Sequence, residues 1–235
     1  MRRYINLIKA LYFIELLRLA KKRLTWNDIS SKLGESPAAL SRYMHGHVIP
    51  GGDKMDRLIS QLEYVIDFER EILDRVRYDT KSGFIDNQKL ISDIKFLDLV
   101  AKRVAAKYIG KIDVVLSPAA DGIPFATLVA NYMDCNLAII KDYKETAVHK
   151  YIEGVIYTED GGVRPLYLPR SLVRKGYRAL IVDDVIRTGA THKAIVDMLA
   201  KVKARVEAIS VLIVIGDAWR NSIKDVIVDY LAYMP

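Results

Sequence analysis

The sequence predicts an α/β fold, in which helices cover a parallel sheet, preceded by a smaller unit made of helices alone. Beyond about residue 80, continuous apolar runs alternate with segments of helical periodicity, and this alternation is typical of parallel sheets. The first sixty residues instead show three helical segments separated by short turns. We therefore assign residues 1–80 to an all-helical domain and residues 81–235 to an α/β domain.

The composition is that of an ordinary globular protein, with 51% hydrophobic and 28% charged residues, and it lacks the depletion in apolar residues that marks disorder. The most apolar N-terminal stretch, residues 5–20, contains Lys9, Glu15 and Arg18, so we expect neither a membrane span nor a signal peptide. Cys135 is the single cysteine, which fits a reducing compartment. We expect a cytoplasmic protein with no membrane partner.

The net charge of +7 is concentrated at the N-terminus. Residues 1–60 contain 11 Lys and Arg against 5 Asp and Glu, whereas residues 61–235 contain 25 against 24. A basic block beside a neutral one indicates a polyanion-binding module joined to a domain of another kind. On charge alone, a solvated basic helix face is the alternative.

The first two helices are predicted from apolar spacing and from capping residues. The first helix has apolar residues three or four positions apart, and these are Ile5, Ile8, Tyr12, Leu16 and Leu19. Thr25 and Asp28 have the spacing of a capping box for a second, short helix, which Gly34 ends. Ser36 and Pro37 then begin a third helix.

Residues 24–62, in which Gly46 and Pro50 close the third helix, resemble the helix-turn-helix of the lambda repressor and Cro family. In such motifs the third helix enters the major groove, so the resemblance implies that double-stranded promoter DNA is a partner. The residues implied to face DNA are Ser36, Ala38, Ala39, Ser41 and Arg42, with Lys32, His45 and His47 near the phosphate backbone. A helix pair that binds a protein instead is the alternative.

A connecting helix is predicted over residues 55–78, because Leu58, Leu62, Ile66 and Ile72 recur at helical spacing. Residues 80–83 then contain the break that we take as the domain boundary. In the second domain we expect strands at residues 114–116, 137–140, 179–182 and 209–215, and helices at about residues 87–108, 122–133 and 189–203. Ligands of open parallel sheets bind beyond the carboxyl ends of the strands.

The segment after the third of these strands carries a phosphate-binding pattern. Asp183 and Asp184 follow the apolar run, and Arg187, Thr188, Gly189, Ala190 and Thr191 lead into the next helix. Backbone amides and hydroxyls at a helix N-terminus can surround a phosphate, and the two acids can accept hydrogen bonds from ribose hydroxyls or hold Mg²⁺ that a pyrophosphate brings. A plain strand end followed by a capped helix does not explain the order of these residues.

This pattern resembles the phosphoribosyl-pyrophosphate (PRPP) motif of type I phosphoribosyltransferases and implies their fold. The resemblance implies that Asp183 and Asp184 contact the ribose and that residues 187–191 bind the 5-phosphate. A second loop of that family, which binds pyrophosphate, is matched after the first strand by Ser117, Ala119, Ala120, Asp121 and Gly122. The two motifs occur in the order that the family has.

The segment after the second strand departs from the enzymes of this family. Lys141 and Lys144 match lysines of orotate phosphoribosyltransferases, which implies contacts with pyrophosphate, but Ile140 stands where those enzymes carry an arginine. The histidine and glycine that follow the second lysine there are Thr146 and Ala147 here. A solvated edge is the ordinary interpretation of these lysines.

Residues 168–176 resemble the bacterial purine repressor, and the layout of the whole chain resembles archaeal regulators related to orotate phosphoribosyltransferase, which control sugar metabolism. The implied function is a homodimeric transcriptional regulator of sugar or nucleotide metabolism. Its effector would be PRPP, another sugar phosphate or a nucleotide, with Mg²⁺ accompanying a pyrophosphate. The alternative is an active orotate or purine phosphoribosyltransferase.

Overall fold

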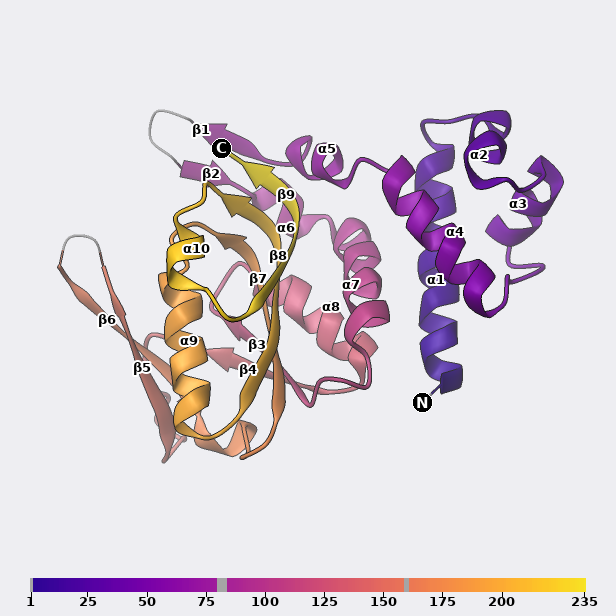
Figure 1. Ribbon diagram of the computed structural model, residues 1–235. Coiled ribbons are helices and arrows are strands. Elements are labelled where there is room, and N and C mark those ends of the chain that lie inside the picture. Colours follow the sequence, from indigo (N-terminus) through magenta and orange to yellow (C-terminus); the bar gives the residue numbers. More distant parts are fainter. Residues whose placement is uncertain (1, 80–83, 159–160) are drawn as a thin grey trace.

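The computed structural model describes residues 2–79, 84–158 and 161–235. It has a helical N-terminal unit on one side and a sheet covered by helices on the other, as Figure 1 shows. The domain boundary predicted near residue 80, with Thr80, Ser82 and Gly83, lies outside the described residues.

Four helices build the N-terminal unit: α1 (Arg2–Lys21), α2 (Trp26–Leu33), α3 (Pro37–Met44) and α4 (Gly52–Val65). The predicted capping box is confirmed, because the Thr25 side chain accepts from the Asp28 amide and the Asp28 carboxylate accepts from the Thr25 amide. Gly34 ends α2 with a positive φ of 67°, and Ser36 caps α3. The sequence therefore specifies the turn between α2 and α3 locally.

The predicted connecting helix over residues 55–78 is wrong. α4 ends at Val65, and a separate helix α5 (Phe68–Leu73) follows, whose first turn Asp67 caps by accepting from the Arg70 amide. Ile66 ends α4 with an extended backbone, φ −88° and ψ 113°, and both Ile66 and Phe68 on either side of Asp67 are buried. The chain then forms the antiparallel pair β1 (Arg77–Asp79) and β2 (Phe84–Asp86).

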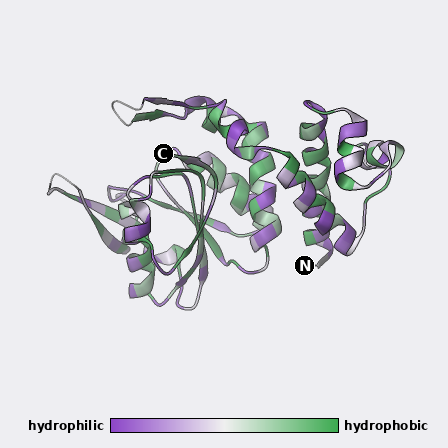
Figure 2. Ribbon diagram, turned by 45° about the horizontal axis from the view of Figure 1, so that its top comes forward, coloured by the Kyte–Doolittle hydropathy of each residue, from purple (hydrophilic) through white to green (hydrophobic). Residues whose placement is uncertain are grey.

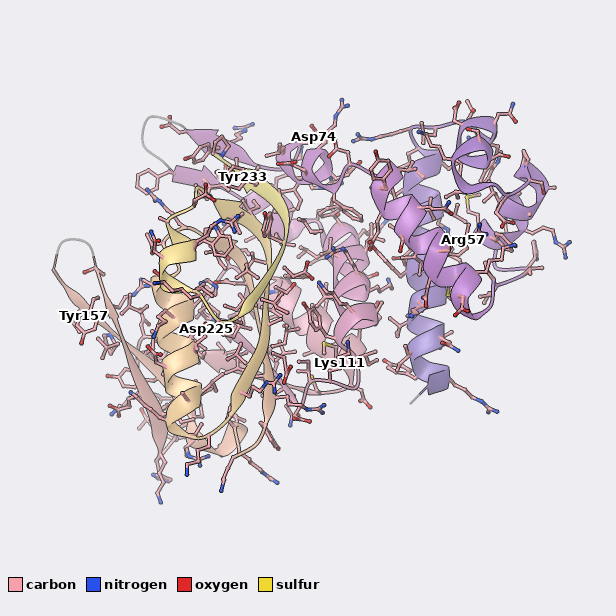
Figure 3. The ribbon with its side chains drawn as sticks, in the orientation of Figure 1. Arg57, Asp74, Lys111, Tyr157, Asp225 and Tyr233 are labelled. Carbon is pink, nitrogen blue, oxygen red and sulfur yellow. The ribbon has the colours of Figure 1, made fainter. Side chains whose placement is uncertain are left out.

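α5 lies against the end of the sheet, so the contacts of the second unit begin before residue 80. The Tyr233 amide of the last strand donates to Glu69 of α5 at 3.3 Å. Figure 3 shows Tyr233 and Asp74 at the same side of the molecule.

The central sheet has five parallel strands in the order β4-β3-β7-β8-β9. They are β3 (Val114–Pro118), β4 (Asn136–Ile140), β7 (Arg178–Ile186), β8 (Arg205–Ile215) and β9 (Ile227–Met234). The four predicted strands and their parallel direction are confirmed, whereas β9 was not predicted. Its residues are mostly half-buried, so it lacks the continuous apolar run that marks a central strand.

Helices cover both faces of this sheet. α6 (Gln88–Ser92), α7 (Ile94–Tyr108) and α8 (Ile123–Met133) belong to one side, and α9 (Ala190–Lys201) to the other, with the short α10 (Trp219–Ser222) after β8. The helix predicted over residues 87–108 is divided at Asp93, which ends α6 and caps α7 by accepting from the Phe96 amide. A side chain that bonds to the local backbone competes with a continuous helix.

A second antiparallel pair, also not predicted, extends from the sheet beside α9. It consists of β5 (Tyr151–Tyr157) and β6 (Val163–Pro169), and the 3₁₀ turn η1 (Arg170–Leu172) follows it. Alternate residues of β5 are buried, as one covered face of a two-stranded ribbon requires. Figure 3 shows Tyr157 near its outer end.

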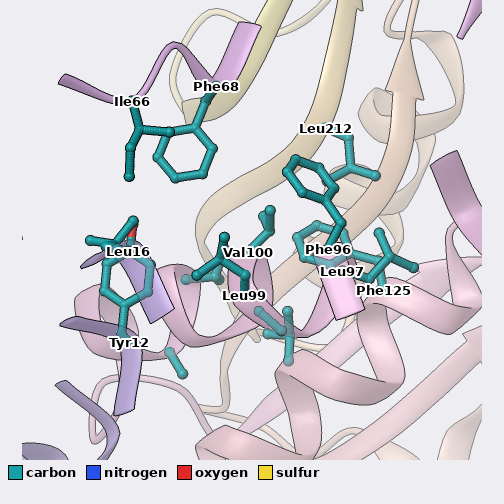
Figure 4. Close-up of a cluster of buried hydrophobic side chains, with 14 of the residues drawn as sticks. Tyr12, Leu16, Ile66, Phe68, Phe96, Leu97, Leu99, Val100, Phe125 and Leu212 are labelled. Carbon is teal, nitrogen blue, oxygen red and sulfur yellow. The ribbon is translucent and has the colours of Figure 1, made fainter. Parts of the chain in front are cut away.

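The buried apolar side chains form two clusters, one on each face of the sheet. Figure 2 shows that the strands are largely hydrophobic, whereas the helices alternate between hydrophobic and hydrophilic residues. The first cluster continues from the sheet through α7 into α1, where Tyr12 and Leu16 lie close to Leu99 and Val100 (Figure 4). The N-terminal unit and the sheet thus share one core. Among the described helices, none is both long and apolar enough to cross a membrane.

Replacing Leu16 with alanine should destabilise the whole molecule, because Leu16 is fully buried where α1 meets α7. We expect a loss of about 2–5 kcal/mol in the free energy of unfolding, measured by urea denaturation. Leu7→Ala on the same helix is the matched control, since Leu7 is 52% exposed. Equal losses for the two variants would contradict the shared core.

Candidate ligand site

Asp183 and Asp184 lie near the carboxyl end of β7, the central strand of the sheet. Asp183 is 7% exposed, and its Oδ1 accepts from the Asp184 amide at 3.0 Å. Burial, together with the charge of Asp183, raises the pKa of Asp184 to about 8. A buried carboxyl whose pKa is displaced this far is typical of a functional site.

Two residues that the sequence did not single out contact these acids. Nδ2 of Asn87 donates a short hydrogen bond to Oδ2 of Asp184. Nε2 of His192, in the first turn of α9, lies 3.1 Å from Oδ2 of Asp183, although the atoms are not aligned for a hydrogen bond. His192 directly follows the Thr-Gly-Ala-Thr pattern and could have been found from its place in the first turn of a helix. Asn87 lies 97 positions from Asp184, so no local pattern could have revealed it.

The predicted phosphate loop connects β7 to α9. Gly189 has a φ of 75°, and a Cβ there would lie 3.2 Å from atoms of Ser222 and Ile223, so the turn requires glycine. Ser222 holds the loop by donating to the Thr188 carbonyl at 2.9 Å, and the Ala190 amide donates to the Thr188 hydroxyl. Arg187 is exposed, whereas Thr188, Ala190 and Thr191 are half-buried. The loop therefore places the N-terminus of α9 beside the acids, as phosphate binding requires.

The second predicted loop follows β3 and packs directly on the acid pair. A Cβ on Gly122 would lie 2.4 Å from Oδ1 of Asp183 and 2.9 Å from its Cα, so only glycine allows this approach. Ala119, Ala120 and Asp121 are exposed, and the peptide bond between the two alanines is cis. Ser117 is fully buried in β3 and its hydroxyl donates to the Pro118 carbonyl, which turns it away from a ligand-contacting role.

Lys141 and Lys144 are engaged by acids of their own segment. The Lys141 ammonium lies 2.6 Å from Glu145, and the Lys144 ammonium lies 2.6 Å from Glu153. Ile140, at the position of the arginine in orotate phosphoribosyltransferases, is 1% exposed and belongs to the core. The structure thus brings the acids and the two loops together, while the lysines stand at the end of β4, two strands from β7.

A bound Mg²⁺ would need ligands besides the protein. No group of three or more His, Cys, Asp or Glu side chains that could hold a metal occurs in the described part of the chain. The two acids alone fit a cation that a pyrophosphate brings with it, since Mg²⁺ is often held by one or two carboxylates and the oxygens of a phosphate.

The residues predicted to face DNA lie on and around α3. Lys32, Ser36, Ala38, Arg42, His45 and His47 are exposed, and Ser41 is half-buried. Ala39 is also half-buried, and it packs in part against the helical core. Ser36 uses its hydroxyl to accept from the Ala39 amide. Neither Lys32 nor Arg42 forms an ion pair within residues 2–79, 84–158 and 161–235, so their charges face solvent.

Comparison with known proteins assigns the second unit. Residues 85–230 match the model of a family described as "Phosphoribosyl transferase domain". The fold resembles the crystal structure of adenine phosphoribosyltransferase from Thermoanaerobacter pseudethanolicus with a TM-score of 0.63 and 21% identity, covering 70% of this chain and 98% of that one. The match confirms the type I phosphoribosyltransferase fold that the sequence predicts.

Curated relatives include both enzymes and regulators. An adenine phosphoribosyltransferase of Mycoplasmopsis synoviae is 29% identical over 63% of this chain and 84% of its own length. "Transcriptional regulator GfcR 1" of Methanosarcina barkeri is 33% identical over 44% of this chain, and "Probable purine biosynthesis transcriptional regulator PurR" of Streptococcus pneumoniae is 26% identical over 55%. The chain spans about half the length of these regulators, 46% and 48%.

Asp184→Asn should stabilise the ligand-free protein at neutral and alkaline pH. A carboxyl whose pKa is higher in the folded than in the unfolded state destabilises the fold as it ionises. This penalty is absent below the unfolded value near 3.8 and complete above about 8. We expect the free energy of unfolding of the variant to exceed that of the parent by a margin that grows from pH 4 to 8 and reaches the order of a few kcal/mol.

Differential scanning calorimetry across this pH range measures the margin. Asp142→Asn is the control, because Asp142 is an exposed acid after β4. A margin that stays constant with pH would show that the pKa of Asp184 is not raised in the folded protein.

Proposed function

Because the chain belongs to the phosphoribosyl transferase domain family, we propose that it is a cytoplasmic transcriptional regulator in which this domain senses a phosphoribosyl ligand. PRPP, a sugar phosphate or a nucleotide would occupy the acid pair and the phosphate loop. Occupancy would change the affinity of the N-terminal helices for promoter DNA. A ligand can do so only by binding the DNA-competent and the incompetent state unequally.

One observation favours a sensor over a transferase, namely the burial of Ile140 in the core. The position at which orotate phosphoribosyltransferases carry an arginine cannot here present a cation to a leaving pyrophosphate. The groups proposed to bind the ribose and the 5-phosphate, Asp183, Asp184 and residues 187–191, are in place beside Gly122. The chain therefore carries the residues proposed to bind the ligand, whereas it has one cation fewer to stabilise a leaving pyrophosphate.

DNA binding is supported by the exposed charges around α3 and by the regulators among the relatives. Arg42 and Lys32 are the cations that we propose to contact DNA, with His45 and His47 after α3. Two copies of the chain would place two recognition helices about 34 Å apart along the duplex. We therefore propose a homodimer acting on double-stranded promoter DNA.

Arg42→Ala should weaken DNA binding about 5- to 150-fold, the range expected when one base or phosphate contact is lost. The measurement is fluorescence anisotropy on promoter fragments recovered with the protein, repeated over a range of salt concentrations. Arg174→Ala changes the same charge at an exposed position of the other unit and should leave the affinity unchanged. If Arg42→Ala binds as tightly as the parent, α3 is not the recognition surface, and an affinity independent of salt would indicate a protein partner instead.

An active phosphoribosyltransferase is the second candidate, favoured by the adenine and xanthine phosphoribosyltransferases among the relatives.

For the proposed regulator, we expect PRPP binding in the presence of Mg²⁺ without turnover of adenine, xanthine or orotate. Asp183→Asn should weaken PRPP binding about tenfold or more, because a hydrogen bond to a charged acceptor is lost. Calorimetry and a coupled pyrophosphate assay measure these two properties. Pyrophosphate release that depends on one of the bases would establish the enzyme.

A further inference from the structure

Asn87 is a buried side chain that joins the acid pair to another part of the fold. It is 5% exposed, and its amide donates to Asp184 across 97 positions of sequence. Asn87 also stands at the N-cap of α6, where an asparagine commonly bonds to the first turn. Its side-chain oxygen makes no such cap bond, so the contact that its side chain makes is the one donated by Nδ2 to Asp184.

The oxygen that Asn87 contacts is also one that a ligand would use. Burial, and then the neighbouring charge of Asp183, raise the pKa of Asp184 to about 8. A donated hydrogen bond stabilises the ionised form of such a carboxyl. A ribose hydroxyl or a cation at Asp184 supplies the same stabilisation, so its arrival alters the bond that holds Asn87.

The backbone of Asn87 is tied to the helices that follow it. Its carbonyl accepts from the amides of Leu90 at 2.8 Å and Ile91 at 3.0 Å. Asp93 then joins α6 to α7 by capping α7, and it pairs with Arg75 at 2.9 Å. A displacement of Asn87 is therefore passed to α6 and α7 rather than absorbed by a loop.

The N-terminal helices are attached to α7 by partly buried charge pairs. Lys102, 3% exposed, binds Glu15 of α1 at 2.8 Å. Arg103 lies 3.4 Å from Glu63 of α4, and Glu63 accepts from the Tyr12 hydroxyl of α1 at 2.6 Å. A movement of α7 away from α1 would leave the buried Lys102 ammonium with fewer partners, which is costly, so α1 and α4 should follow α7.

We propose that Asn87 is the positioning residue through which occupancy of the acid pair is coupled to α7 and from there to the N-terminal helices. The inference rests on the proposed function in that it takes the acid pair as a ligand site. It adds the route, which starts at the Asn87–Asp184 hydrogen bond and ends at Glu15 and Glu63.

The test compares Asn87→Ala with Gln88→Ala in the full-length protein. Gln88 is the exposed neighbour of Asn87, and it donates to Asp86 through its backbone amide, which an alanine keeps. The probe is PRPP with Mg²⁺, and three quantities are measured: PRPP affinity by calorimetry, hydrogen exchange of α1, α6 and α7 with and without PRPP, and DNA affinity with and without PRPP. Because no cap bond is lost, Asn87→Ala should fold, and Asn87→Ser is the second variant.

In the parent and in Gln88→Ala, PRPP should change exchange in α1 and α7 and shift DNA affinity about 5- to 150-fold. In Asn87→Ala, PRPP affinity should stay within about fivefold of the parent, the size of one net hydrogen bond. The exchange difference in α1 and α7 should disappear, and the ratio of DNA affinities should fall toward one.

The coupling role is overturned if PRPP changes hydrogen exchange and DNA affinity in Asn87→Ala as much as it does in the parent. It is also overturned if Asn87→Ala loses PRPP affinity by more than about a hundredfold, because Asn87 would then be a ligand-binding residue. A parent that binds PRPP but not DNA contradicts the proposed regulator alone, because hydrogen exchange still decides the role of Asn87. A parent that binds none of PRPP, sugar phosphates and nucleotides overturns both.

Discussion

The packing of α1 on α7 is the constraint on which the arrangement of the whole molecule depends. At its centre lies the ammonium of Lys102, 3% exposed, between Glu15 of α1 and Asp98 of α7. A buried ammonium is tolerated only when it is paired. Asp98 supplies one carboxylate from α7 itself, and Glu15 supplies a second from α1, which makes this pair a directional contact between the two helices. The apolar residues around it, such as Leu16 and Val100 (Figure 4), add packing that has no direction of its own. The charge pair and the apolar contacts together hold the N-terminal helices against α7.

The acid pair is the opposite case, a place where the fold accepts an unfavourable arrangement. Two adjacent carboxyls near the end of a central strand repel each other and are partly removed from water, which raises the pKa of Asp184. Three elements compensate: Gly122 leaves room for Asp183, while Asn87 and His192 approach the two carboxyls. Sites that violate local rules in this way are usually functional. A ligand that donates to the acids would relieve the same repulsion.

Local patterns explain why much of the fold could be predicted from the sequence. The capping of α2 by Thr25, the apolar runs of four strands and the turn at Gly189 each depend on residues within one or two turns of chain. The candidate site followed from the order of acids, glycine and threonines. The two helix boundaries were missed although the caps that set them are local. Asp67 begins α5 by accepting from the Arg70 amide, and Asp93 begins α7 by accepting from the Phe96 amide. The apolar spacing continues across both acids, so that pattern alone did not reveal the breaks.

Other features depend on distant partners and leave no local trace. β9 is recognisable as a strand only beside β8, since its residues are half-buried rather than continuously apolar. Asn87 has the sequence position of an ordinary helix cap, and only the structure shows that its side chain donates to Asp184. Ala39 has the spacing of a solvent-facing residue, yet α3 is so short that its packing against the rest of the helical unit covers a wide face. In each case the missing information was the identity of a neighbour far away in the sequence.

The distinction between sensor and enzyme then becomes a question of which interactions differ between a bound ligand and a transition state. Contacts to the ribose and the 5-phosphate through Asp183 and residues 187–191 contribute to both states, and uniform binding does not accelerate a reaction. Acceleration requires groups that respond to charge developing on the leaving group. Lys141 and Lys144 could be released for that purpose at little cost, because their ion pairs with Glu145 and Glu153 are exposed. Ile140 cannot be recruited, since its side chain belongs to the core. The residues proposed to contact the ribose and the 5-phosphate would thus serve the proposed sensor, whereas position 140 supplies no cation to a leaving group.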